Sequence, residues 1–194
     1  MKDYEIQNVL PFIIDYLDNP STDDESDCKR RGNLYKLLNL KYDEEKKTCP
    51  YLTGPLGEEI IEIYYSLQNI PYDRKQKVKS SRSKGYHKPD GLENEKYFVE
   101  VKMRAYHSEG TAHEKIPSIA FKYGTLPKKL KIYLLADDEH KYNTYWSKLL
   151  RNEISPLNEF EKKYRDSHYL MIEQIVYGTD VSKLMKDYVN KKES

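Results

Sequence analysis

Apolar residues in the first part of the chain recur at intervals of three and four positions. Such spacing places them on one face of an α-helix, so we expect a helix from Asp3 to Asn19 that is kinked at Pro11. Its apolar face consists of Ile6, Val9, Leu10, Ile13, Ile14 and Leu17. The acidic run from Ser21 to Asp27 has no apolar period and predicts an exposed loop, after which we expect a short helix from Leu34 to Leu40.

A second amphipathic segment begins at Gly54-Pro55, where proline suits the first turn of a helix because its missing N–H would be unpaired there. We expect this helix to run to about Gln68. On the helical wheel Glu59 lies at the flank of the apolar face, whereas Glu58 and Glu62 point further away. Glu59 is therefore the best placed of the three to approach whatever the helix packs on.

The middle of the chain has the patterns of strands. The segment from Tyr97 to Met103 alternates, so that Phe98, Glu100 and Lys102 share one face and Val99, Val101 and Met103 share the other. The polar residues from Glu93 to Lys96 predict a hairpin tip before this strand. The apolar run from Leu130 to Ala136 predicts a central strand.

The remaining elements indicate an α/β protein. We expect a short helical segment ending near Tyr123-Gly124, a helix from Asn143 to Arg151 that can resume as far as Tyr164, a strand from Tyr169 to Val176, and a terminal helix from Val181 to Tyr188 that is capped by Thr179 or Asp180. This order predicts one α/β domain over residues 1–194. It divides into a helical N-terminal region (1–50), a core (55–140) and C-terminal helices with a strand (141–194).

Composition excludes several classes of protein. With 38% hydrophobic and 34% charged residues, the chain can bury a core, so global disorder is not expected. The apolar runs are too short for a bilayer and the N-terminus lacks a signal-peptide pattern, so we expect a soluble, cytoplasmic protein without a membrane partner. Cys28 and Cys49 are too few and too far apart for a disulfide framework or a zinc site of known spacing, and we expect reduced thiols.

A net charge of only +1 conceals one strongly basic segment. Residues Arg74 to Lys88, here called the basic arm, include seven Lys or Arg and no acidic residue. We interpret the arm as a contact to DNA phosphates; a solvated loop is the alternative. The expected contacts on the arm are Lys77, Lys79, Arg82, Lys84 and Lys88.

Asp90, Glu100 and Lys102 carry the candidate chemistry. A hairpin can bring Asp90 and Glu100 to one side of a sheet, and Lys102 projects from the same face of its strand as Glu100. Paired carboxylates hold the hard divalent cations that assist phosphodiester hydrolysis. The alternative is that these residues have no catalytic role, because Pro-Asp-Gly is a common turn and Glu-Val-Lys is a common solvent-facing pair on a strand. The helix with Glu59, the basic arm and the apolar neighbours of Glu100 favour the nuclease interpretation.

Three nearby segments resemble the catalytic region of type II restriction endonucleases of the PD-(D/E)xK superfamily. They are Val99–Tyr106, Gly110–Ile116 and Lys122–Gly124, and the resemblance covers about residues 55 to 140. It implies a mixed central sheet flanked by helices and Mg²⁺-dependent cleavage of double-stranded DNA, with Mn²⁺ able to substitute. It also implies 5′-phosphate and 3′-hydroxyl ends, homodimeric action and no organic cofactor.

The resemblance also implies roles for individual residues. Asp90 and Glu100 match metal-binding carboxylates, the backbone carbonyl of Val101 would complete the set, and Lys102 matches the lysine that orients or deprotonates the attacking water. Glu59 matches a helix glutamate that reaches the metal; Glu58 or Glu62 could serve if the helix is rotated.

Further DNA contacts are expected at Arg104 and Lys115, although a surface ion pair of Glu114 with Lys115 is an equal alternative. His87, His107 and His113 are expected to be DNA contacts or surface groups and not catalysts.

The leading hypothesis is thus a sequence-specific type II restriction-like endonuclease. A structure-specific or repair nuclease of the same fold, such as a junction resolvase or nickase, is the second. A non-catalytic DNA-binding protein is the third, and it is disfavoured because all four catalytic positions hold competent residues.

Overall fold

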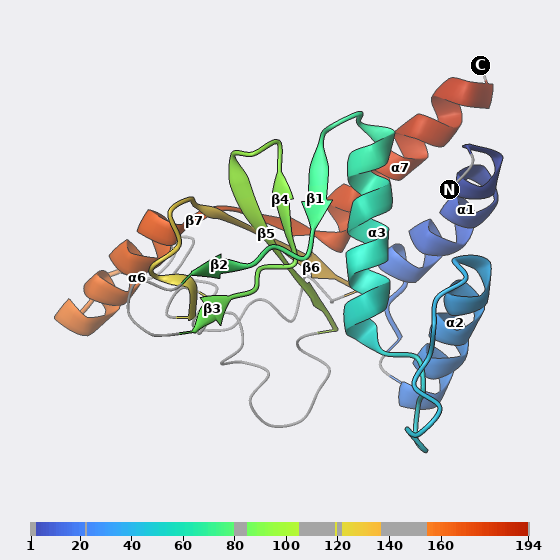
Figure 1. Ribbon diagram of the computed structural model, residues 1–194, viewed down its shortest axis with the longest axis horizontal. Coiled ribbons are helices and arrows are strands. Elements are labelled where there is room, and N and C mark those ends of the chain that lie inside the picture. The colour runs from blue at the N-terminus through green and yellow to red at the C-terminus, as the bar shows by residue number, and fades with distance from the viewer. Residues whose placement is uncertain are drawn as a thin grey trace.

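A five-stranded mixed sheet forms the centre of the molecule (Figure 1). The computed structural model describes residues 3–21, 23–79, 85–104, 119, 122–136 and 155–193. In spatial order the strands are β1 (Tyr72–Arg74), β4 (Gly91–Glu93), β5 (Tyr97–Met103), β6 (Leu130–Leu135) and β7 (Ile172–Tyr177). The pairs β1–β4 and β4–β5 are antiparallel, whereas β5–β6 and β6–β7 are parallel. The expected α/β class with a mixed central sheet is therefore confirmed.

Five helices are described around this sheet. They are α1 (Asp3–Asp18), α2 (Asp24–Leu37), α3 (Thr53–Leu67), α6 (Glu159–Met171) and α7 (Gly178–Glu193). Figure 1 shows α1, α2, α3 and α7 gathered on one side, with α6 at the far end of the sheet. Among the helices in the described part of the chain, none combines the length and apolar composition that a membrane crossing requires.

The alternation predicted for β5 divides the core into two clusters. Val99, Val101 and Met103 face the larger cluster, which contains the buried side chains of α1, α2 and α3. Phe98 faces the smaller cluster on the other side of the sheet, beside Ile132 and Leu134 of β6. Glu100 and Lys102 project from the same face as Phe98, as the alternation predicts.

Helix α3 lies close against β5 because Gly57 has no side chain at the contact. A Cβ atom at this position would be 3.0 Å from Cγ1 of Val101 and 3.5 Å from Cβ of Met103. The close approach brings the glutamates of α3 toward the part of β5 that carries the candidate catalytic residues.

The prediction of an exposed loop from Ser21 to Asp27 is wrong, because α2 begins inside this acidic run. Asp23 caps the helix by accepting a hydrogen bond from the backbone N–H of Ser26 at 2.6 Å. Acidic residues in the first turn also interact favourably with the helix dipole. Among them Asp27 is buried with a side-chain exposure of 1%, which an apolar period cannot reveal.

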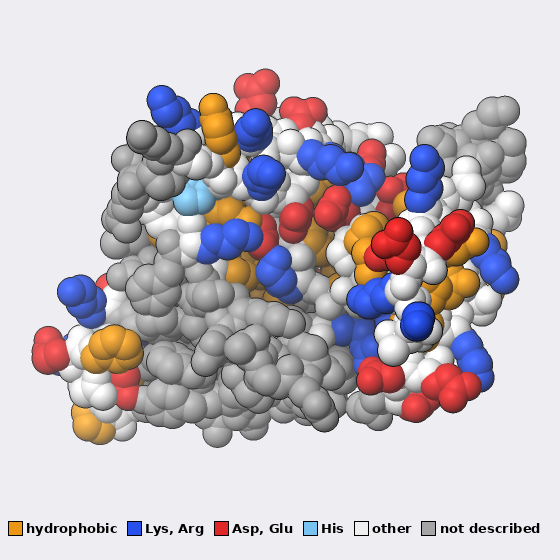
Figure 2. Space-filling view, turned by 60° about the horizontal axis from the view of Figure 1, so that its bottom comes forward, with side chains coloured by type: hydrophobic (Ala, Val, Ile, Leu, Met, Phe, Trp, Pro, Cys, Tyr) orange, Lys and Arg blue, Asp and Glu red, His pale blue; other side chains and the backbone are white. Residues whose placement is uncertain are grey.

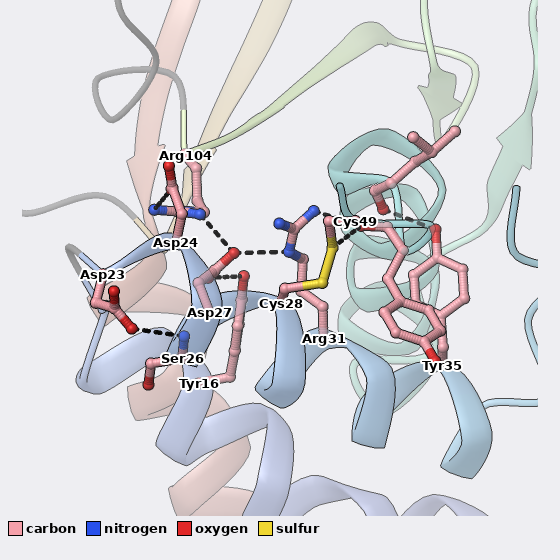
Figure 3. Close-up of a disulfide and its surroundings, with 12 residues drawn as sticks. Tyr16, Asp23, Asp24, Ser26, Asp27, Cys28, Arg31, Tyr35, Cys49 and Arg104 are labelled. Atoms are coloured by element: carbon pink, nitrogen blue, oxygen red, sulfur yellow. Dashed lines mark hydrogen bonds and ion pairs between the residues drawn. A yellow bond between two sulfur atoms is a disulfide. The ribbon is translucent and has the colours of Figure 1, made fainter. Parts of the chain in front are cut away.

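Arg104 supplies one reason why Asp27 can be buried (Figure 3). Its guanidinium lies 2.5 Å from Asp27, which also pairs with Arg31 at 2.7 Å and accepts a hydrogen bond from Tyr16 at 2.8 Å. Arg104 itself is buried. The prediction that Arg104 contacts DNA is therefore corrected: it joins the end of β5 to α2 because a buried carboxylate needs charged partners.

The expectation of reduced thiols is also wrong. Cys28 of α2 and Cys49 form a disulfide with a Cα–Cα distance of 5.9 Å (Figure 3). The two residues are 21 positions apart in sequence, but the chain after α2 folds back along the helix and brings them together. Spacing alone could not show this return.

The C-terminal elements are present with shifted boundaries. The helix expected to end near Tyr164 extends to Met171 as α6, so β7 begins at Ile172 and not at Tyr169. Helix α7 follows β7 directly, and Asp180 accepts a hydrogen bond from the N–H of Tyr177 at 3.1 Å. The helix expected from Asn143 to Arg151 lies outside the described residues.

Candidate active site

Asp90, Glu100 and Lys102 come together where β4 meets β5. Asp90 directly precedes β4, and its Oδ2 accepts a hydrogen bond from the N–H of Val101 at 2.7 Å. Lys102 Nζ lies 2.5 Å from Oε1 of Glu100, two residues earlier on the same face of β5. The antiparallel pairing of Gly91 with Val99 closes the ten-residue separation of the two carboxylates.

Glu100 is the most deeply buried of the three residues, with a side-chain exposure of 2%. Its Oε1 faces both Lys102 and Lys122, the latter at 3.3 Å, and its Oε2 accepts a hydrogen bond from the hydroxyl of Tyr123 at 2.6 Å. Burying a carboxylate is costly unless charges and hydrogen bonds compensate for lost water. These partners therefore compensate for the burial of the Glu100 carboxylate and hold it in one orientation.

Tyr123 and Lys122 belong to the site, although sequence reasoning assigned neither a role. Tyr123 is fully buried, and its hydroxyl also lies 3.2 Å from the carbonyl oxygen of Lys88. Lys122 lies over the Tyr123 ring, with Nζ 4.4 Å from the ring centroid. The resemblance included the segment Lys122–Gly124 but gave neither residue a role, because only the return of the chain beside β5 brings them to Glu100.

The pKa of Asp90 is raised to about 6, mainly by burial of the carboxyl and secondly by repulsion from the Glu100 carboxylate. The hydrogen bond from Val101 and the charge of Lys102 act in the opposite direction, whereas Glu58 adds to the rise. Two carboxylates that repel each other at a partly enclosed site favour a bound cation.

An open cavity of about 350 Å³ lies beside Asp90. It is lined by Glu58, Lys75, Gln76, Lys77, Lys88, Pro89 and Asp90. Lysines and carboxylates therefore lie side by side, and Figure 2 shows such a mixture of blue and red side chains in the upper middle of the view. The lysines can attract an anionic ligand to the position where the carboxylates can hold a cation.

The structure favours Glu58 over Glu59 as the carboxylate that α3 contributes. Glu59 is 2.8 Å from Arg74, which also binds Glu62 at 2.6 Å and reaches Glu58 at 3.3 Å. Glu58 lines the cavity with Asp90, whereas Glu59 does not. Arg74, predicted as part of the basic arm, thus binds α3 because three glutamates converge on it.

The donor atoms fit a hard divalent cation. Lys102 Nζ lies 3.3 Å from the carbonyl oxygen of Val101 as well as 2.5 Å from Glu100, so these two oxygens already face one cation. Carboxylate and carbonyl oxygens are the ligands that Mg²⁺ prefers. Among the described residues no group of three or more His, Cys, Asp or Glu is arranged for a metal. The oxygens that would hold such a cation are those of Asp90, Glu100 and the Val101 carbonyl, two carboxylates and one backbone group.

The expected DNA contacts divide into three groups. Two of them, Lys77 and Lys88, are exposed near the cavity, and Lys79 is exposed on the strand that follows Lys77. Arg104, in contrast, is buried. The others, Arg82, Lys84 and Lys115, lie outside the described residues, as do His107, His113 and Glu114.

His87 is not a free surface group. Its Nε2 is 2.7 Å from the hydroxyl of Thr125, and its ring centroid is 5.7 Å from that of Tyr123. The side chain therefore holds its strand against the residues that support Glu100.

No family model, curated protein or solved structure matches this chain. Function must therefore be inferred from the residues of the site.

Proposed function

We propose that this chain is a Mg²⁺-dependent endonuclease that cleaves double-stranded DNA, with Asp90, Glu100 and Lys102 as its catalytic residues. The observation that carries the proposal is the meeting of two carboxylates and a lysine at the β4–β5 junction, with 2.5 Å between Lys102 and Glu100 and 2.7 Å between Asp90 and the Val101 N–H. A purely structural ion pair would account for Lys102 and Glu100, but it would not require a second, partly buried carboxylate beside them.

Each residue has a distinct part in hydrolysis. Asp90, Glu100 and the Val101 carbonyl would hold the metal, for which Mn²⁺ could substitute, and Tyr123 holds the Glu100 carboxylate in place. Mg²⁺ supplies charge neutralisation at the phosphate and favours ionisation of the attacking water. Lys102 is partly exposed, with a side-chain exposure of 27%, and would donate to that water or to a phosphate oxygen.

The cavity supports a nucleic-acid substrate. Lys75, Lys77 and Lys88 line it beside Asp90, so an anionic backbone is attracted to the carboxylate-bound cation. The resemblance of the β5 segment to type II restriction endonucleases narrows the proposal further. It extends to a restriction-endonuclease-like sheet, site-specific cleavage with 5′-phosphate and 3′-hydroxyl ends, and action as a cytoplasmic homodimer.

Plasmid cleavage tests this proposal. Wild-type protein, Lys102→Ala and Glu100→Ala are incubated with supercoiled plasmid in Mg²⁺ or in EDTA, with Lys183→Ala, an exposed lysine of α7, as the matched control. We expect wild type and the control to cut in Mg²⁺ only, and each site variant to lose at least about a hundredfold in rate. An intact plasmid with wild type, or an unchanged rate with Lys102→Ala, would contradict the proposal.

The products distinguish the related activities. Discrete fragments with identical ends indicate a site-specific enzyme. Single nicks, or cutting confined to branched DNA, indicate a nickase or junction resolvase of the same chemistry. If the protein binds DNA but does not cleave it in Mg²⁺ or in Mn²⁺, it is the non-catalytic DNA-binding protein of the third hypothesis.

A further inference from the structure

The basic arm contains a two-stranded antiparallel ribbon that the sequence did not predict. Strand β2 (Val78–Lys79) pairs with β3 (Tyr86–His87), with Val78 opposite His87 and Lys79 opposite Tyr86. Side chains opposite each other in a ribbon share a face, so Val78 and His87 lie on one face and Lys79 and Tyr86 on the other.

The face with Val78 and His87 is attached to the protein. Val78 packs against the cluster that contains Phe98, and His87 contacts Thr125 and Tyr123. The ribbon is therefore held against the residues that support Glu100, and its opposite face is directed away from the core.

That opposite face is basic and exposed. Lys77, Lys79 and Lys88 are exposed; Lys79 lies opposite Tyr86 in the ribbon, and Lys77 and Lys88 directly flank its two strands. Tyr86 is 53% exposed, and Lys77 Nζ lies over its ring at 4.5 Å from the centroid. An exposed aromatic ring among lysines, on a segment without acidic residues, is suited to an anionic partner that also offers apolar or aromatic edges.

The exposed face continues into the candidate active site. Lys77 and Lys88 line the cavity beside Asp90. Asp90 follows His87 by three residues, so the end of the ribbon is at most about 10 Å from it along the chain. A duplex with one phosphate at Asp90 must therefore present a groove to the ribbon.

Size decides which groove this is. The two strands of a ribbon lie about 4.8 Å apart, and side chains widen it further. The major groove of B-DNA is about 12 Å wide and admits a two-stranded ribbon, whereas the minor groove is only about 6 Å wide. We infer that the exposed face of the β2–β3 ribbon enters the major groove next to the cleaved phosphate, with Lys79 and Tyr86 at the base edges and Lys77 and Lys88 on the flanking phosphates.

This inference rests on the proposed function for its substrate, duplex DNA, and adds the element and groove by which the duplex is recognised. Fluorescence anisotropy with a labelled mixed-sequence duplex in EDTA tests it, because binding is then measured without cleavage. One duplex carries glucosylated 5-hydroxymethylcytosine in place of cytosine, which fills the major groove. A second, unmodified duplex is saturated with netropsin, which fills the minor groove at A·T steps.

We expect glucosylation to weaken wild-type binding by about tenfold or more and netropsin to change it by less than about twofold. The Lys79→Ala/Tyr86→Ala double variant is expected to bind the unmodified duplex about tenfold more weakly and to lose its sensitivity to glucosylation. Lys183→Ala on α7 is the control and should bind as wild type does. Both altered side chains are exposed, and a thermal melt checks that the variant is folded.

Displacement by netropsin without an effect of glucosylation would place the protein in the minor groove and overturn the inference. Equal binding to all three duplexes would overturn it as well. If the protein cleaves plasmid in Mg²⁺ but glucosylation does not affect binding, only the inference about the ribbon is refuted. If binding depends on the ribbon but the protein cleaves no DNA in Mg²⁺ or Mn²⁺, only the proposed nuclease activity is refuted.

Discussion

Replacing Asp90 with asparagine should stabilise the metal-free protein above neutral pH. Burial and the Glu100 carboxylate raise the pKa of Asp90 from 3.8 to about 6. Between these values the folded protein binds more protons than the unfolded chain, so the free energy of unfolding decreases as pH rises. The stabilising contribution of the protonated carboxyl is complete below the unfolded pKa and is lost above about pH 6.

The size of the effect follows from the shift. A shift of about two units corresponds to about 3 kcal/mol, since each unit is worth about 1.4 kcal/mol. Asparagine can still accept the hydrogen bond from the Val101 N–H, which measures 2.7 Å, but it carries no charge. We therefore expect Asp90→Asn to gain up to about 3 kcal/mol over wild type at about pH 8 in EDTA.

Urea unfolding in EDTA, at about pH 4 and about pH 8, measures this difference. The gain should shrink toward zero at the lower pH because Asp90 of the wild type is then largely protonated. Asp73→Asn is the matched control, since Asp73 is an exposed carboxylate of β1 and its replacement should change little.

Mg²⁺ should offset most of this difference in stability. Wild type gains about 2.7 kcal/mol at a Mg²⁺ concentration a hundred times its dissociation constant, whereas Asp90→Asn lacks a ligand and gains much less. If Asp90→Asn is no more stable than wild type at about pH 8 in EDTA, the raised pKa assigned to this partly buried carboxyl is wrong.

Three further predictions concern residues whose roles depend on the tertiary structure. Tyr123→Phe removes the 2.6 Å hydrogen bond to Glu100 and should weaken Mg²⁺ affinity by about tenfold in calorimetry without DNA; unchanged affinity would exclude a positioning role. Glu58→Gln should slow plasmid cleavage more than Glu59→Gln, and the reverse ranking would return the role to Glu59. Arg104→Ala should lower the free energy of unfolding by about 3 kcal/mol in urea, because a buried aspartate loses one of its two arginines; a change within about 0.5 kcal/mol would show that the pair is not structural.

The strand β5 and the helix α3 could be predicted because their patterns are local. A strand of period two must place Glu100 and Lys102 on one face and Val101 on the other, whatever surrounds it. The two core clusters confirm this division. The start of α2 could not be predicted in the same way, because its buried position Asp27 is compensated by Arg104, which is 77 residues further along the chain.

The same distinction applies to the site. Sequence spacing predicted that Asp90, Glu100 and Lys102 would meet, and it predicted a basic segment beside them. It favoured Glu59, whereas the cavity beside Asp90 is lined by Glu58, because a helical wheel describes the faces of a helix but not the angle at which the helix meets the sheet.

By itself, the sequence determined the alternating strand that presents a carboxylate and a lysine together, the aspartate before the preceding strand, and the acid-free basic arm. These depend on the geometry of one or two neighbouring elements. Only the tertiary structure decided that Tyr123 and Lys122 enclose Glu100, that Arg104 is buried, and that the arm forms a ribbon with one face free. Each of those outcomes depends on contacts between distant segments, whose burial and charge pairing no local pattern records.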